Sequence, residues 1–510
     1  MTATEDPKHR PFLFRHNLEQ DGFAVRAGSS STPDPFALVR RHKMDSAGGN
    51  NAGQPYKILR VPCPRAEQHD IDKDFGLFHL RADEAVVYLG PTPPRCDYFS
   101  FTPYVWVRHA DSLAPKGDWV FAATGDPLNV SRIGTEKTEE NDGPFAANTL
   151  VIFAADEEVA KSVAKAALDA NYPEEMINFV GIPSALVRMA DATPGEIGDS
   201  LAILVRTANF AESDDREENI KDRAVKHHYL RSDDYAHVWR VTPSTPPTQS
   251  TLFEPQPPRQ RRDQPEESRV PGLTAGLERL QQAILDAIPH TDYRVYGSIR
   301  WFLDSREVLS ETNRASPSFH KFVAGEGSDT PYLRTALEGA PANFTLAEDE
   351  IAVVFGVNHA ATGLATYSNF GVYGDWILGR EPECAPFLFG DGTNPVWNGV
   401  AGANSHSFTG TATRYLGEND PMAPYLYAVK ALRDAPTDQP EGSFVTVPST
   451  SRDLPEELAD QITGTSIRYI PLDQPLMIGY RAYLNPRTKA GPAYEDLIPD
   501  RVLWLKLPPA

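Results

Sequence analysis

A proline-rich stretch near the middle of the chain constrains its fold more than any other feature. Residues 242–271 read TPSTPPTQSTLFEPQPPRQRRDQPEESRVP, with few apolar side chains among many prolines and charges. Such a composition cannot bury enough apolar surface to form a core and is typical of an extended linker. The chain has 510 residues, more than one hydrophobic core usually supports. The stretch therefore predicts a linker between two domains.

The segments on either side of this linker are both rich in short strands. Residues 56–241 carry several β-type runs and a helical pattern, which predicts an α+β domain. Residues 272–510 open with an amphipathic helix and continue mainly as strands, and the polar residues 1–55 are typical of a flexible N-terminal arm. The predicted fold class is α+β, with two strand-rich domains. Aromatic residues alternate in both halves, but the two patterns do not align closely enough to predict an internal repeat.

The overall charge narrows the range of partners. The formal net charge is −21, which repels nucleic-acid backbones and anionic lipid head groups, so neither is expected as a partner. Three widely spaced cysteines rule out a disulfide framework and fit a reducing compartment. No window approaches the roughly 18 apolar residues of a membrane helix, and the N-terminus lacks the apolar segment of a signal peptide. The sequence predicts a soluble, cytoplasmic protein with a small-molecule ligand, and it leaves the oligomeric state open.

The main candidate site follows an apolar run in the second half. Residues 351–355 are rich in β-branched and aromatic side chains, which predicts a buried strand, and a loop of small and polar residues follows. In this loop His359 is the candidate catalytic acid/base, because imidazole titrates near neutral pH. Tyr367 is a candidate hydrogen-bond donor or second acid, and Asn358 and Thr362 are candidate substrate-binding residues. The alternative is that His359 hydrogen-bonds only its own loop.

A second candidate lies near the C-terminus, where residues 478–484 read IGYRAYL. Arg481 stands inside this apolar strand, and an unpaired buried charge costs several kcal/mol, so the guanidinium must be paired if it faces inward. Its planar fork could bind a carboxylate of the substrate. A structural ion pair with one of the chain's own acids is the alternative.

Two histidines and an aspartate offer an alternative metal site. His359, His406 and Asp391 all belong to loops of small residues, and imidazole and carboxylate groups are common metal ligands. The spacing of the three residues is not diagnostic of any metal, so the cofactor is not determined.

One stretch resembles a known family. Residues 389–395 read FGDGTNP, and residues 417–421, GENDP, precede a predicted strand. Over Phe389–Asp434 only, this pattern resembles the glycine–aspartate motif and the next strand of dye-decolourising haem peroxidases. The resemblance implies haem, paired ferredoxin-like α+β domains and a role for Asp391 in peroxide cleavage. The family's iron-ligating histidine is replaced by Arg433, which cannot ligate haem iron.

Three functions remain open on these grounds. The sequence lacks the signatures of α/β-hydrolases, P-loop enzymes, Rossmann dehydrogenases and zincins. The leading hypothesis is an enzyme that acts by acid/base chemistry on a small organic molecule in an aromatic-lined pocket, with Arg481 as the anchor for an anionic group. The alternatives are a haem-dependent, peroxidase-like oxidoreductase and a non-catalytic small-molecule-binding or scaffold protein. The sequence does not determine the reaction class.

Overall fold

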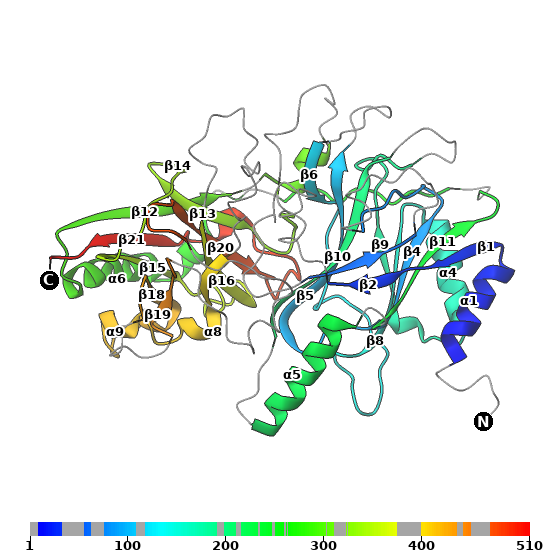
Figure 1. Ribbon diagram of the computed structural model, residues 1–510, viewed down its shortest axis with the longest axis horizontal. Helices are drawn as coiled ribbons and strands as arrows, with labels where there is room; N and C mark the ends of the chain where they lie inside the picture. Colours follow the sequence, from blue (N-terminus) through cyan, green and yellow to red (C-terminus); the bar gives the residue numbers. More distant parts are fainter. Residues whose placement is uncertain are drawn as a thin grey trace. The chain divides into compact units, whose positions relative to one another are not determined.

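Figure 1 shows the computed structural model of the protein, which is α+β as the sequence predicts, with 20% of residues in helices and 38% in strands. The chain divides into two compact units. Unit 1 comprises Met1–Asp34, Gln54–Pro258 and Asp304–Gly327, and unit 2 comprises Pro35–Gly53, Arg259–Leu303 and Ser328–Ala510. The residues that the structure describes are 9–32, 56–62, 76–108, 118–190, 198–210, 216–232, 235–246, 250–259, 262, 264–301, 303–310, 323, 325–374, 399–435, 442–449 and 470–509.

Unit 1 is built from two sheets and the helices that accompany them. Its elements are α1 (Arg10–Gln20), β1 (Phe23–Ala27), β2 (Ser29–Ser31), β3 (Lys57–Arg60), β4 (Ala85–Pro91), β5 (Cys96–Arg108), β6 (Asp118–Ala123), β7 (Leu128–Asn129), β8 (Asn148–Ala154), α4 (Glu157–Leu168), β9 (Ile177–Gly181), β10 (Ser200–Phe210), α5 (Arg216–Arg231), β11 (His237–Pro243) and α7 (Ser305–Ser310). The strand orders are β1-β11-β4-β8-β9 and β2-β3-β10-β5-β6. Helices α1 and α4 pack on the first sheet in one apolar cluster, in which Phe14 and Val159 meet Leu150.

Unit 2 is built on one large sheet. Its elements are η3 (Glu267–Arg269), α6 (Leu273–Ala287), β12 (Asp292–Arg300), β13 (Tyr332–Leu337), β14 (Ala340–Pro341), β15 (Glu350–Val357), β16 (Tyr367–Gly374), β17 (Gly399–Asn404), α8 (Ser405–Phe408), α9 (Thr413–Leu416), β18 (Leu426–Leu432), β19 (Phe444–Thr446), β20 (Leu476–Tyr483), η6 (Tyr494–Asp496) and β21 (Arg501–Lys506). The strand order is β17-β16-β20-β13-β12-β21-β15-β18-β19.

This sheet curls around its own core. Val372 on β16 and Val429 on β18, from distant strands, belong to one apolar cluster. We call the side of the sheet that lines this cluster its interior face. On the opposite side of β15, β18 and β21, helix α6 packs through Leu277 and Leu280 (Figure 1). The amphipathic helix and the buried strand at 351–355 that the sequence predicts are confirmed as α6 and β15.

The two units share one topology. Across unit 1 the strands come in the order β6-β5-β10-β3-β2 and then β1-β11-β4-β8-β9. Across unit 2 the order is β17-β16-β20-β13-β12-β21-β15-β18-β19, and each strand of unit 1 has its counterpart at the same place in this order. The long strand β12 replaces both β1 and β2, because residues 292–296 pair with β21 and residues 297–300 pair with β13. Each path ends in a parallel pair, β8 with β9 and β18 with β19. The counterparts also follow one another in the same order along the chain, so the molecule contains one fold twice.

The N-terminal segment is not the flexible arm that its polar composition predicts. Residues 9–32 contain α1, β1 and β2, and β1 pairs with β11 over its whole length. Phe14 and Leu18 of α1 are fully buried in the core of unit 1. A helix of low overall hydrophobicity is held in place by these two side chains, which a count of polar residues does not reveal. The rest of residues 1–55 lies outside the described residues.

The division between unit 1 and unit 2 falls within residues 242–271, between Pro258 and Arg259, and the described parts of this stretch contact the units. The amide of Phe253 donates to the carbonyl of Ala155 at 3.0 Å, and the Phe253 ring lies against Gly181 in unit 1. Further along, the side chain of Glu267 is buried in unit 2. A few well-placed side chains therefore dock this stretch onto the units, although its average composition is that of a linker.

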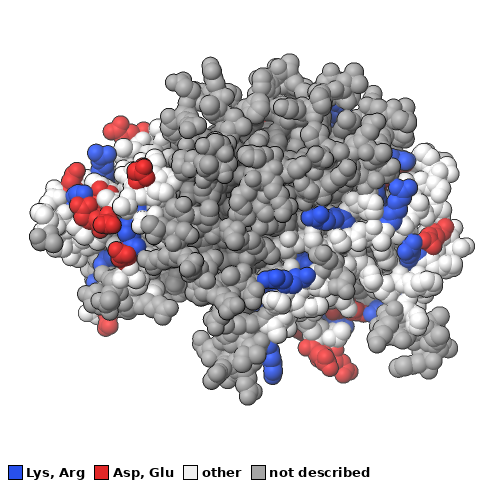
Figure 2. Space-filling view, in the orientation of Figure 1, with Lys and Arg blue, Asp and Glu red and all other residues white. Residues whose placement is uncertain are grey.

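The described surface carries both signs of charge. Figure 2 shows acidic and basic side chains beside one another at the end of the view where α6 lies. Arg279 and Asp420 form such a pair at 2.8 Å, and Lys506 and Asp349 form another at 2.6 Å. Among the described residues, no helix is long and apolar enough to span a membrane.

Candidate functional site

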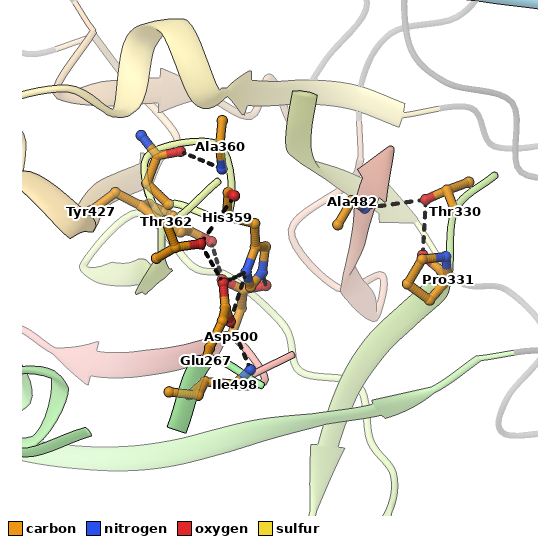
Figure 3. Close-up of polar contacts among 11 residues, drawn as sticks. Glu267, Thr330, Pro331, His359, Ala360, Thr362, Tyr427, Ala482, Ile498 and Asp500 are labelled. Carbon is orange, nitrogen blue, oxygen red and sulfur yellow. Dashed lines mark hydrogen bonds and ion pairs between the residues drawn. The ribbon is translucent and has the colours of Figure 1, made fainter. Parts of the chain in front are cut away.

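His359 lies in the loop that follows β15 and is only 4% exposed. Its Nδ1 is 2.9 and 3.1 Å from the two carboxylate oxygens of Glu267, and its Nε2 is 3.5 Å from Oδ2 of Asp500. Figure 3 shows the imidazole held among these carboxylates. Segments far apart in sequence thus meet at one ring, because Glu267 belongs to η3 and Asp500 immediately precedes β21.

Further groups complete the pairing of the two carboxylates. The hydroxyl of Thr362 and the amide of Ile498 donate to Glu267, at 2.8 and 2.9 Å. On the other side, the phenol of Tyr427 donates to Oδ1 of Asp500 at 2.9 Å. We call Glu267, His359, Thr362, Tyr427 and Asp500 the carboxylate–imidazole network.

The network determines the charge of His359. Burial by itself lowers the pKa of this imidazole, but the neighbouring carboxylates of Glu267 and Asp500 more than offset burial and raise the pKa to about 10. At neutral pH the ring is therefore an imidazolium that presents both N–H groups to carboxylates. A group in this state is a poor proton acceptor, so the geometry favours a role in holding Asp500 over the role of general base.

Asn358 in the loop and Gly356 near the end of β15 explain why the chain folds this way locally. The Asn358 amide donates to the carbonyl of Tyr425 at 2.8 Å, and its side-chain oxygen accepts from the amide of Ala360 at 3.2 Å, which closes the turn that carries His359. At Gly356 a Cβ atom would lie 2.0 Å from Oδ1 of Asp500. Glycine is therefore required there, because any side chain would displace the carboxylate.

Arg481 and Tyr367 lie on the face of the sheet that is opposite the interior face. Consecutive strand residues point to opposite faces, and Tyr480 belongs to the interior cluster together with Tyr427, so Arg481 points away from that cluster. The ring of Tyr367 lies 5.6 Å from that of Tyr483, two residues beyond Arg481 on the same face. Of the five residues that the sequence predicts for the site, the structure brings together His359, Thr362 and Asn358 and separates the other two from them.

Arg481 is held between two tyrosines. Its Nη1 donates to the hydroxyl of Tyr373 at 2.7 Å, and its guanidinium carbon lies 4.9 Å from the ring centroid of Tyr332. The next residue is fixed as well, because the amide of Ala482 donates to the hydroxyl of Thr330 at 3.1 Å (Figure 3). We call Arg481, Tyr332 and Tyr373 the guanidinium clamp of unit 2.

Several buried hydroxyls have no hydrogen-bond partner within the described part of the chain, and two of those on the interior face of unit 2 lie on adjacent strands. These two are the hydroxyls of Tyr480 and Ser368. These residues project from neighbouring strands, since Tyr480 pairs with Phe370 and Ser368 pairs with Ala482. Burial and the nearby carboxylate of Asp500 raise the pKa of Tyr480, so its phenol stays protonated. A buried polar group left unpaired costs about 1–3 kcal/mol, so this pair calls for an explanation.

The guanidinium clamp occurs in both units. Arg206 on β10 and Arg481 on β20 occupy corresponding positions, and each donates from Nη1 to a tyrosine hydroxyl, that of Tyr104 at 3.1 Å and that of Tyr373 at 2.7 Å. In each case the tyrosine lies four residues beyond the residue that pairs with the arginine. The ring of Tyr56 lies under Arg206, at 5.6 Å, as that of Tyr332 lies under Arg481.

Within the described residues, the carboxylate–imidazole network occurs in unit 2 and not in unit 1. Gly90 and Gly356 correspond, because a Cβ atom on either would collide with the residue that precedes the last strand of its unit, Ala236 and Asp500 respectively. From these corresponding residues, the strand pairings of each unit identify the counterparts of the other network and hydroxyl residues. The unit 1 counterparts of His359, Asp500, Tyr427, Tyr480 and Ser368 are Pro93, Ala236, Thr149, Val205 and Phe99. Unit 1 therefore has no titratable side chain at any of these five positions.

The described residues give no support to the alternative metal site. His359 is protonated and bonded to two carboxylates, His406 is exposed, and Asp391 lies outside the described residues. Among the residues that the structure describes, no group of three or more histidine, cysteine, aspartate or glutamate side chains could hold a metal ion.

Arg433, at the position of the haem ligand in the family that the sequence resembles, hydrogen-bonds to backbone carbonyls of this chain. The guanidinium of Arg433 is buried and donates to the backbone carbonyls of Leu346, Val447, Ile470 and Pro471, with Nε 2.6 Å from the first. Burial lowers the pKa of Arg433 to about 10, and the side chain remains a cation at neutral pH. A guanidinium held in this way does not fit an iron-ligating role.

Sequence reasoning finds His359 but misses its partners. Glu267 lies in the stretch whose prolines predict a linker, and Asp500 is a single acid before the last strand. Tyr427 and Tyr480 are typical strand aromatics, without a sequence signal that separates them from core residues. The one available signal is Gly356, since a glycine inside an apolar strand indicates the close approach of another group.

Comparison with known proteins adds no function. No family model matches the sequence, and no curated protein matches it. An uncharacterized protein from Burkholderia cenocepacia of known structure is similar, with 11% sequence identity, a TM-score of 0.35, and coverage of 99% of this chain and 92% of that one. A likeness at this level supports no argument about fold or function.

Proposed function

We propose that the protein is an enzyme that acts on a small organic molecule by acid/base chemistry at the interior face of unit 2. One observation carries this proposal: the interior face of unit 2 gathers Asp500, Tyr427, Tyr480 and Ser368, where unit 1 has small, apolar or internally bonded side chains. Proteins depart from the rule that buried faces are apolar mainly where function requires it. The duplicated fold provides the reference against which that departure is visible.

Asp500 is the proposed proton acceptor. The phenol of Tyr427 and the imidazolium of His359 hold its two oxygens in one orientation, which favours catalysis by positioning. A proton from an acidic C–H, N–H or O–H bond of the substrate would pass to this carboxylate. In this assignment His359 is a positioning residue, and the acid/base role predicted for it from the sequence passes to Asp500.

Tyr480 is the proposed hydrogen-bond donor. Its phenol keeps its proton because burial and Asp500 raise its pKa. A donor held in an apolar surrounding stabilises negative charge that develops on a substrate oxygen more strongly than a donor in water does. The stacked rings of Phe408 and Tyr427, 3.8 Å apart, would supply the aromatic lining predicted from the sequence.

The test is a thermal-shift screen of small molecules on the full chain, followed by mass spectrometry of each compound that binds. We expect Asp500→Asn to abolish turnover of the substrate found. The control is Asp349→Asn, an exposed acid of the same unit that pairs with Lys506, and its turnover should equal that of the parent chain. Turnover that survives Asp500→Asn would contradict the proposal.

A non-catalytic binding protein is the second candidate. His359 and Asp500 are each 4% exposed, and Tyr480 is 2% exposed, so these side chains are shielded from solvent. Deep burial of this kind suits retention of a ligand as well as turnover. A compound that binds in a manner dependent on Asp500, and is recovered unchanged, would favour this candidate.

A further inference from the structure

The interior face of unit 2 carries two hydroxyls on adjacent strands, and one of them, the phenol of Tyr480, lies near the carboxylate of Asp500. Tyr480 and Ser368 project from adjacent strands on the same face, and neither hydroxyl has a partner within the described residues. In unit 1 the corresponding side chains are Val205 and Phe99, both apolar and buried. The two hydroxyls are therefore a specific feature of unit 2 that the shared fold does not require. Two O–H groups on adjacent strands of one face can both donate to a single acceptor oxygen.

The charges around this face disfavour an anion. The carboxylate–imidazole network places two carboxylates, Glu267 and Asp500, around one imidazolium, so negative charge is in excess. An anionic ligand group beside Asp500 would meet a like charge in a surrounding of low dielectric, where the repulsion is strong. A neutral oxygen meets no such penalty.

The guanidinium clamp cannot offset that charge at this face. Arg481 directly follows Tyr480 in β20 and therefore points to the opposite side of the sheet. Its guanidinium lies against Tyr332 and donates to Tyr373 there. Unit 1 keeps the same clamp without the two hydroxyls, so the clamp and the hydroxyl pair do not depend on one another.

From these observations we infer that the substrate presents a neutral carbonyl oxygen to Tyr480 and Ser368, instead of an anionic group to Arg481. This inference rests on the proposed function, since it describes the substrate class of the same site. The carbonyl oxygen accepts from both hydroxyls, and the part of the substrate next to the carbonyl group lies toward Asp500. In this inference the substrate is held by hydrogen bonds from Tyr480 and Ser368 to a neutral oxygen, and not by an ion pair with Arg481 as the sequence predicts.

Three probes of similar size and different charge test the inference: acetophenone, benzoate and benzylammonium. Each is titrated into the full chain and followed by saturation-transfer NMR. We expect acetophenone to bind most tightly, and Tyr480→Phe and Ser368→Ala each to raise its Kd about tenfold, the effect of one lost hydrogen bond. The matched control is Tyr229→Phe, because Tyr229 is a buried phenol of unit 1 that also has no hydrogen-bond partner in the described chain. Its variant should leave the Kd unchanged.

The outcomes separate this inference from the proposed function. Benzoate or benzylammonium binding more tightly than acetophenone, with a Kd sensitive to Tyr480→Phe, overturns the substrate class and leaves the site in place. Binding of acetophenone that is unaffected by both Tyr480→Phe and Ser368→Ala overturns the inference, and the turnover of Asp500→Asn then decides the proposed function by itself. Near-ultraviolet circular dichroism of each variant shows that a lost signal reflects binding and not unfolding.

Discussion

Unit 1 and unit 2 have the same strand pairing but differ in what they bury. Both keep an arginine clasped by two tyrosines on corresponding strands. Unit 2 buries an imidazolium between two carboxylates, whereas at the places of His359 and Asp500 unit 1 has Pro93 and Ala236. The shared clamp shows what this fold retains in both copies. The unshared network shows where the two copies differ in their buried ionisable groups.

The largest expected effect comes from removing the imidazolium. His359→Leu leaves Glu267 and Asp500 buried without their counter-ion, which should cost about 3–5 kcal/mol of unfolding free energy. Thermal denaturation should show a fall in Tm on the order of 10 °C. The matched variant in unit 1, Pro93→Ala, should change Tm far less, because no charge is stranded there. Equal losses in the two variants would remove the contrast between the units.

The pH dependence of stability should follow the same group. The pKa of His359 is raised from its ordinary 6.5 to about 10 in the folded chain, so its contribution is complete below about pH 6.5 and is lost as pH rises toward 10. The loss should reach up to about 4 kcal/mol, measured by urea denaturation at several pH values. His359→Gln should flatten the curve over this window, whereas His406→Gln, at an exposed position, should not. A parent curve that is flat from pH 7 to 10 would refute the ionised network.

Adding one methyl group to each of the corresponding glycines should sharpen the comparison. Gly356→Ala places a Cβ atom against Oδ1 of Asp500 and should cost about 1–3 kcal/mol by overpacking. It should also reduce the pH dependence, because Asp500 moves away from His359. In unit 1, Gly90→Ala meets the Ala236 methyl group and should cost a similar amount without any change in pH dependence. Chemical denaturation at two pH values distinguishes the two outcomes.

The smallest effect, and the one expected to be equal in both units, concerns the clamps. Tyr104→Phe and Tyr373→Phe each remove the acceptor of one arginine hydrogen bond and should each cost about 0.5–1.5 kcal/mol. Differential scanning calorimetry of the two variants provides the comparison. A loss confined to Tyr373→Phe would mean that the clamps have diverged in role, as the interior faces have.

The sequence predicts elements whose residues carry a local pattern. The spacing of Leu273, Leu277 and Leu280 predicts α6, and the apolar run after Glu350 predicts β15. The position of His359 after that strand also follows from the local pattern. The sequence fails where contacts join distant segments, because Glu267 and His359 become neighbours only through tertiary packing.

The repeat of one fold in the two units is also not predicted from the sequence, because it depends on strand pairing between distant segments. The two units share hydrogen-bond register, which is a property of the backbone, while most of the interior side chains differ, as Val205 and Tyr480 do at corresponding positions. The few residues that repeat, among them Tyr104 and Tyr373, are separated by unlike sequence. Once the register is known, these residues align without further assumption.

The assignment of Asp304–Gly327 to unit 1 has a consequence for biosynthesis. Helix α7 belongs to this segment, and its Ser305 hydroxyl accepts from the amide of Ala123 at 3.1 Å. The ribosome must therefore translate β12, which belongs to unit 2, before it reaches the last segment of unit 1. At roughly 5–20 residues per second, the delay after residue 258 is about 4–14 s. During this interval the nascent chain carries an unfinished half, and chaperones that recognise exposed strands would have time to bind it.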